Sequence, residues 1–224
     1  MSLILNGRSS ILESQYYPPI ELESNKNYVI GLTEFLTFNS IPNVDEHNNK
    51  FYVDKEIISI PPGSYEIEDI EKYLISQLEN KNISLSLKVN RNTLFAEIKC
   101  NKNIDFSATN SIGRLLGFTS RLYEADTLYT SDLPVEIISI NAIRVECNIA
   151  TSSYVNDKQV HTIHQFYPSV KPGYKINEVP SSVIYLPINT KNIDHLELRI
   201  VDQEGCLINF RGEIITVRLH IKSI

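Results

Sequence analysis

Apolar and polar side chains alternate most clearly in the last 30 residues of the chain. The alternation runs over residues 196–201 and returns over residues 215–222, and between these runs lie turn-forming segments that contain Gly205 and Gly212. A period of two is typical of half-buried strands. We therefore predict an antiparallel meander over residues 195–224, whose shared apolar face must be covered by a second layer of sheet.

The same signal recurs through the rest of the chain, at the spacing of about 8–12 residues that is typical of sandwiches and barrels. The segments interpreted as strands are residues 28–38, 51–53, 57–60, 83–89, 93–100, 135–149, 158–167 and 183–186. This pattern predicts a mainly β protein that folds as an antiparallel β-sandwich.

One segment instead has the period of a helix. Its apolar positions recur three or four residues apart and are Ile67, Ile70, Leu74 and Leu78. Ser64 is a candidate cap, and the acidic residues of the first turns match the helix dipole. We predict one main amphipathic helix over residues 66–78, packed on a sheet, and interpret its acidic residues as dipole complements rather than as a metal or catalytic cluster.

Residues 1–22 have no sustained period. They contain the apolar doublets Ile11-Leu12 and Tyr16-Tyr17, followed by Pro18-Pro19, which favours extended backbone. We predict an extended N-terminal arm over residues 1–22 and a single domain over residues 23–224. The arm is either a frayed terminus or a segment that orders against a neighbouring subunit.

Charge and composition exclude several classes of function. The chain has 27 Asp and Glu against 21 Lys and Arg, a net charge of −6, which argues against direct nucleic-acid binding. No apolar run reaches the ~18 residues of a membrane span. The three cysteines are odd in number and far apart, so neither a disulfide framework nor a thiolate zinc site is indicated. We expect synthesis in the cytosol or nucleus.

Motifs for catalysis are absent from the sequence. There is no P-loop, GxGxxG, GxSxG or HExxH pattern. A metal site on a sandwich needs histidines on one face of a strand, whereas His161 and His164 are three residues apart and therefore face opposite sides. We expect no enzymatic activity, no cofactor and no bound metal.

The remaining candidates are contacts between subunits. Residues 121–133 form the longest stretch without a clear element, which predicts a crossing between sheets or an interface. The segment Arg211-Gly212-Glu213 is either a simple turn or a loop that makes intersubunit ion pairs. The predicted interface comprises Ile11, Leu12, Tyr16, Tyr17, Pro18, Pro19, Tyr123, Tyr129, Arg211 and Glu213.

Several segments, in order, resemble open reading frames of Polinton (Maverick) elements and related adintovirus-like sequences. They read SSIL…YYPPIEL, GLTEFLTFNSIPN, IPPGSYEIEDIEKYL, NSIGRLLGF and VIYLPIN…LRIVDQEGCLINFRGEIITVRLHIK. The resemblance covers nearly the whole chain and implies a capsid protein. Given the chain length, it implies the single jelly-roll minor capsid protein that forms pentameric vertices, although a minimal jelly roll does not need the helix at residues 66–78.

The resemblance also implies partners and a location. The implied partners are further copies of the chain, in a homopentamer, and the major capsid protein. The implied location is the virion, which is assembled in the host cytoplasm or nucleus. The second hypothesis is a viral attachment or receptor-binding β-sandwich module, and the third is an enzyme on a β-sandwich scaffold. A vertex subunit is a homo-oligomer, so the oligomeric state discriminates among these hypotheses.

Overall fold

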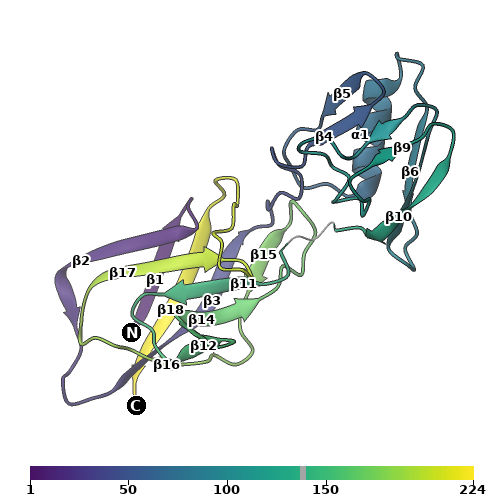
Figure 1. Cartoon of the computed structure of the whole chain (residues 1–224). Coiled ribbons are helices and arrows are strands. Elements are labelled where there is room, and N and C mark those ends of the chain that lie inside the picture. Colours follow the sequence, from purple (N-terminus) through teal and green to yellow (C-terminus); the bar gives the residue numbers. More distant parts are fainter. Residues whose placement is uncertain (137–139) are drawn as a thin grey trace. The chain divides into compact units, whose positions relative to one another are not determined.

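A computed structural model of the chain describes residues 1–136 and 140–224. Its backbone forms two compact units (Figure 1). The sandwich unit comprises residues 1–41 and 140–224, and the inserted unit comprises, among the described residues, residues 42–136. None of the helices among the described residues is long and apolar enough to span a membrane.

Each unit has its own hydrophobic core, and among the described residues no buried side chain is common to both cores. The structure therefore divides the single domain predicted over residues 23–224. The chain leaves the sandwich unit after Ile41 and returns to it at Ile140.

The sandwich unit contains two sheets, and every strand pairing within them is antiparallel. The first sheet has the order β1 (Ser2–Gly7), β18 (Ile215–Ser223), β3 (Tyr28–Phe38) and β15 (Lys175–Glu178), and β16 (Leu186–Pro187) also pairs with β3. The second has the order β14 (Thr162–Phe166), β11 (Ile143–Cys147), β17 (Asn192–Val201) and β2 (Ile11–Glu21). A separate hairpin joins β12 (Ser153–Val155) to β13 (Lys158–Val160).

The order of these strands is that of a jelly roll. When the eight strands of the two sheet paths are counted along the chain, the first sheet reads first, eighth, third and sixth. The second sheet reads fifth, fourth, seventh and second. Consecutive strands thus alternate between the sheets except for the fourth and fifth, which pair within the second sheet, and this order is the double Greek key of a jelly roll. The predicted fold class, a mainly β sandwich of jelly-roll type with one helix, is confirmed.

Alternation along the strands builds the sandwich core. In β18 the apolar side chains of Ile215, Val217, Leu219 and Ile221 are at most 2% exposed, and the residues between them face outward. Aromatic rings fill one part of the core, where the Phe35 centroid lies 5.0 Å from that of Phe166. The polar-apolar pattern of the sequence therefore decides which face of each strand is buried.

The two C-terminal strands do not form the predicted meander. β17 belongs to one sheet and β18 to the other, so their apolar faces meet across the core. The connection between them carries Ile208 and Phe210, which are 3% and 2% exposed. Alternation requires only that one face of each strand is buried. Two strands that face each other across the core meet this requirement as well as two neighbouring strands of one sheet do.

Residues 1–22 are strands of the sandwich rather than an arm. β1 pairs with β18, and β2 pairs with β17 in the other sheet. Leu3, Leu5 and Leu12 are at most 8% exposed and belong to the core. Their burial supplies the free energy that orders this segment.

The inserted unit combines two small sheets with the helix. One sheet has the order β5 (Glu56–Ser59), β4 (Lys50–Val53), β8 (Ile104–Asp105) and β9 (Leu122–Tyr123). The other has the order β10 (Leu128–Pro134), β7 (Phe95–Cys100) and β6 (Leu85–Val89). The helix is α1 (Ile67–Leu78), and its predicted stripe of four apolar residues is at most 2% exposed.

Some element boundaries differ from the prediction. The N-cap residue of α1 is Glu66 rather than the predicted Ser64, and the Glu66 backbone N–H donates to Asp69 Oδ2 at 3.3 Å. The strand expected over residues 135–149 is reduced to β11, and residues 137–139 of that range lie outside the described residues. The strand expected over residues 158–167 is divided between β13 and β14.

Candidate subunit-contact surfaces

The sandwich unit ends each sheet in an edge strand whose backbone groups face outward on one side. These edges are β1 and β15 in the first sheet and β14 and β2 in the second. An exposed edge is a template for pairing with another chain unless it is interrupted or covered. The edges are therefore the first places to look for contacts between subunits.

The edge strand β2 is interrupted by four of the residues that sequence analysis placed at an interface. In its ladder with β17, Ile193 pairs with Ile20 and His195 pairs with Gln15, so residues 16–19 oppose a single residue. Two of the four are prolines, which lack the N–H that a ladder needs. This bulge breaks the hydrogen-bonding edge of β2.

The six N-terminal residues of the predicted interface divide between surface and core. Tyr17 is fully exposed and Pro18 is exposed, whereas Ile11, Tyr16 and Pro19 are half-buried. The sixth, Leu12, is only 3% exposed and packs in the sandwich core. Leu12 is therefore a core residue, and Tyr17 is the side chain of this group with most surface to offer a partner.

Residues 121–133 carry β9 in one sheet of the inserted unit and β10 in the other, so the predicted crossing between sheets is confirmed. Tyr123 is 1% exposed, and its ring packs edge-on against Tyr129 at a centroid distance of 4.9 Å. The Tyr129 hydroxyl accepts a hydrogen bond from the Glu124 N–H at 3.2 Å. Tyr123 is thus a core residue of the inserted unit, and Tyr129 is half-buried beside it.

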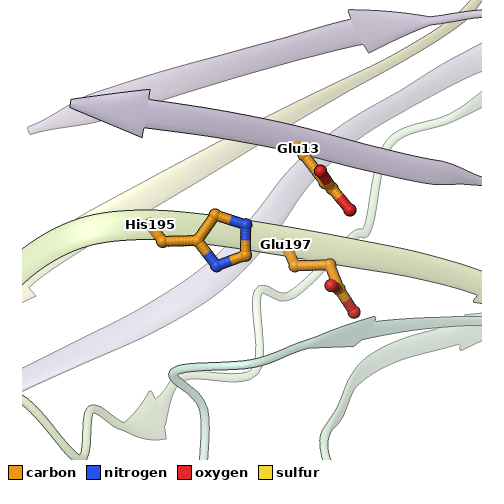
Figure 2. Close-up of side chains that lie close together, drawn as sticks. All are labelled: Glu13, His195 and Glu197. Atoms are coloured by element: carbon orange, nitrogen blue, oxygen red, sulfur yellow. The ribbon is translucent and has the colours of Figure 1, made fainter.

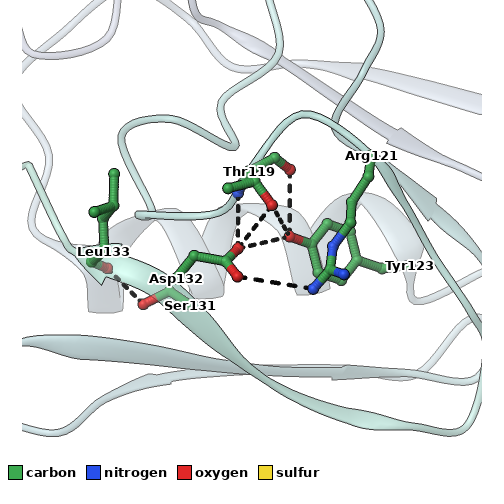
Figure 3. Close-up of polar contacts among 6 residues, drawn as sticks. All are labelled: Thr119, Arg121, Tyr123, Ser131, Asp132 and Leu133. Carbon is green, nitrogen blue, oxygen red and sulfur yellow. Dashed lines mark hydrogen bonds and ion pairs between the residues drawn. The ribbon is translucent and has the colours of Figure 1, made fainter.

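A polar network around Asp132 ties this segment together (Figure 3). Asp132 Oδ2 accepts hydrogen bonds from the Thr119 N–H at 3.0 Å, the Thr119 hydroxyl at 2.8 Å and the Tyr123 hydroxyl at 3.2 Å. The Thr119 N–H and hydroxyl, with the Tyr123 hydroxyl and Arg121, lower the pKa of the Asp132 carboxyl. The Arg121 guanidinium also lies 4.7 Å from the centroid of the Tyr123 ring. These contacts give the segment a structural role within its own unit.

The segment Arg211-Gly212-Glu213 is a turn at the surface of the sandwich unit. Arg211 and Gly212 have φ angles of 54° and 75°, and the Glu213 N–H donates to the Phe210 carbonyl at 3.0 Å. Arg8 donates to the Gly212 carbonyl at 2.7 Å. Within the described part of the chain, neither Arg211 nor Glu213 forms an ion pair, so their role between subunits stays a prediction.

Exposed apolar side chains add a feature that the sequence did not single out. In the inserted unit, Leu122, Leu128 and Leu133 are 57–62% exposed, and all three lie on β9 or β10. In the sandwich unit, Ile4 on β1 is 55% exposed. Alternation identifies an outward position but does not explain why an apolar residue occupies it, so these residues are recognised only once the strands are placed.

The two histidines considered as metal ligands have separate protein partners. His161 Nδ1 lies 2.7 Å from the Ala150 carbonyl oxygen, and His164 Nε2 lies 2.9 Å from Glu178 Oε1. They do not converge on one centre. The three cysteines are free thiols, with Cys100 and Cys147 buried and Cys206 exposed.

No protein-family model matches the chain, and no curated protein matches its sequence. Among solved structures, the crystal structure of the SeMet-labelled mavirus penton protein aligns with 100% of this chain and 100% of its own, at a TM-score of 0.51 and 14% sequence identity. The chain shares the fold of the mavirus penton protein. The resemblance predicted from the sequence is thereby confirmed for the fold, and the penton fold covers both units because the alignment spans both chains completely.

Proposed function

We propose that this chain is a capsid vertex subunit, a penton protein that assembles into a homopentamer and docks on the major capsid protein of a virion. The single observation that carries the proposal is the match of the penton fold over the whole length of both chains. The role is structural, and it requires no catalytic group or cofactor.

The surface of the sandwich unit supports self-assembly. A closed ring covers sheet edges and exposed apolar side chains that a monomer leaves in water. The fully exposed Tyr17 lies in the bulge of the edge strand β2. Complete burial of one such side chain contributes roughly 1.5–3 kcal/mol, so one aromatic contact repeated around a ring stabilises it substantially.

The mass of the protein in solution tests this proposal. A pentamer of the 25.6 kDa chain has a mass of about 128 kDa by light scattering or native mass spectrometry. We expect that mass at micromolar concentration. A monomer or trimer that binds cells or glycans would contradict the proposal and favour the attachment module.

A pair of matched variants tests the contact surface. Tyr17→Asp places a charge in the β2 bulge, and we expect it to weaken association about 10–100-fold, the equivalent of roughly 1.4–2.8 kcal/mol. The control is Tyr154→Asp, which makes the same substitution at a tyrosine that is 66% exposed on the β12–β13 hairpin. Equal assembly by both variants would exclude Tyr17 from the interface.

Docking on the major capsid protein is tested separately. The purified pentamer should co-sediment with capsids that contain the major capsid protein but lack vertices. Absence of co-sedimentation, with the pentamer intact, would leave self-assembly standing and contradict the docking part of the proposal.

A further inference from the structure

Three side chains of metal-ligand type meet on the outer face of the sheet that holds β2 and β17 (Figure 2). His195 and Glu197 are two residues apart on β17 and share a face, and Glu13 on β2 is paired with Glu197 in the ladder. Leu12 and Leu196, next to them, point into the core, so this face is the outer one. One donor atom from each of the three side chains lies within 4.8 Å of the other two.

The two carboxylates of this group face each other without a cation. Like charges directly opposite in a ladder destabilise the pairing. In the described part of the chain, the side chains of Glu13, His195 and Glu197 make no hydrogen bond or ion pair. The next outward residue of β17, Arg199, is paired with Glu146, with 3.5 Å between Nη1 and Oε2. The carboxylate pair is therefore left for another positive charge.

The donor types select the class of cation. Ca²⁺ and Mg²⁺ take oxygen ligands, whereas an imidazole nitrogen together with two carboxylate oxygens suits divalent transition metals. Zn²⁺ binds such donors at about 2.0–2.2 Å, so two donors on one ion are at most about 4 Å apart. Binding of the ion would therefore require rotation of the glutamate side chains to bring the 4.8 Å group to that size.

We propose that Glu13, His195 and Glu197 form a binding site for a divalent transition-metal ion such as Zn²⁺. The three residues leave at least one coordination position for water. From the sequence we expected no metal site, because the histidines considered there were His161 and His164. The ligands come from positions more than 180 residues apart, and only the pairing of β2 with β17 brings them together.

The bound ion would fasten the edge strand β2 to β17. Because the folded sandwich holds the ligands together and the unfolded chain does not, binding raises the stability of the sandwich unit. All three ligands belong to one chain, so the site is independent of the proposed pentamer. Its test therefore succeeds or fails whatever the oligomeric state.

Titration of the metal-free full-length protein with ZnCl₂ tests the proposal. The Cys206→Ser background removes the exposed thiol, which would bind Zn²⁺ by itself. We expect saturable binding of one Zn²⁺ per chain by calorimetry and a melting temperature that rises with Zn²⁺ but not with Mg²⁺. Absence of saturable binding would overturn the proposal.

Ligand variants locate the site. Glu13→Gln, Glu197→Gln and His195→Asn should each weaken Zn²⁺ binding by about tenfold or more, because each removes one ligand. Glu21→Gln, at the far end of β2, is the matched control for Glu13→Gln and should bind as the parent protein does.

Metal-free stability provides a second readout. Glu13→Gln removes the repulsion across the ladder, so without metal it should melt at or above the temperature of the parent protein. If one variant fails to fold, the other two still locate the site. Unchanged Zn²⁺ affinity in folded ligand variants would show that the ion binds elsewhere and would overturn the assignment.

Discussion

Two neighbouring residues of β1 test whether the N-terminus is part of the sandwich core. Leu5 is 4% exposed and faces the core, whereas Ile4 is 55% exposed on the other face of the sheet. Loss of a buried leucine side chain to alanine costs about 2–5 kcal/mol, from lost transfer free energy and the cavity left behind. We expect Leu5→Ala to cost that amount and Ile4→Ala no more than about 0.5 kcal/mol.

Deletion of residues 1–19 enlarges the same effect. It removes Leu3, Leu5 and Leu12, each at most 8% exposed. Three such losses at about 2–5 kcal/mol each are comparable with the roughly 5–15 kcal/mol that stabilises a whole domain. We expect the truncated chain to lose the folded sandwich unit, whereas an arm outside the core could be deleted without that loss.

Urea unfolding followed by far-UV circular dichroism gives these free energies. The two units have separate cores and need not unfold together, so hydrogen exchange at β18 amides identifies the transition of the sandwich unit. Equal midpoints for Leu5→Ala and Ile4→Ala, or a truncated chain that melts as the full chain does, would refute the reasoning.

Three further predictions concern single residues. The pKa of Asp132 is lower in the folded protein than the ordinary value of 3.8, so its ionised carboxylate stabilises the fold at pH values above 3.8. This stability is lost as the pH falls through the lower folded pKa, and acid unfolding of Asp132→Asn should lack this pH dependence. Cys206 should react with a thiol reagent in the native protein, whereas burial, which raises the pKa of Cys147 to about 11, should protect that thiol until urea unfolds the sandwich. Gly117→Ala should lower the melting temperature of the inserted unit, because φ is +79° and a Cβ would lie 2.1 Å from the Leu133 carbonyl oxygen; unchanged melting would contradict this.

Local pattern was enough to predict the fold class and several elements. The aromatic and β-branched run of β3 has the same bounds in the structure as in the prediction, and the apolar stripe of α1 is buried as expected. Both depend on which side of an element is apolar, which short-range periodicity encodes. The same information does not specify the partner of a strand.

Partnering decided the elements that the sequence did not predict. β17 and β18 face each other across the core because β1 and β2 pair with them in different sheets. The inserted unit was missed because it continues the strand pattern, with no flexible linker at Ile41 to mark its start. Tyr123 was predicted at an interface because the sequence of a polar stretch does not show whether an aromatic side chain within it is exposed or buried. The group of Glu13, His195 and Glu197 was missed because long-range pairing creates it.

Images of the purified full-length protein test the central claim most directly. A penton subunit should appear in negative-stain class averages as a closed ring with five-fold symmetry, and Tyr17→Asp should lower the fraction of such rings. A uniform population of single molecules at micromolar concentration, or rings of another symmetry, would contradict the assignment of this chain to the capsid vertex.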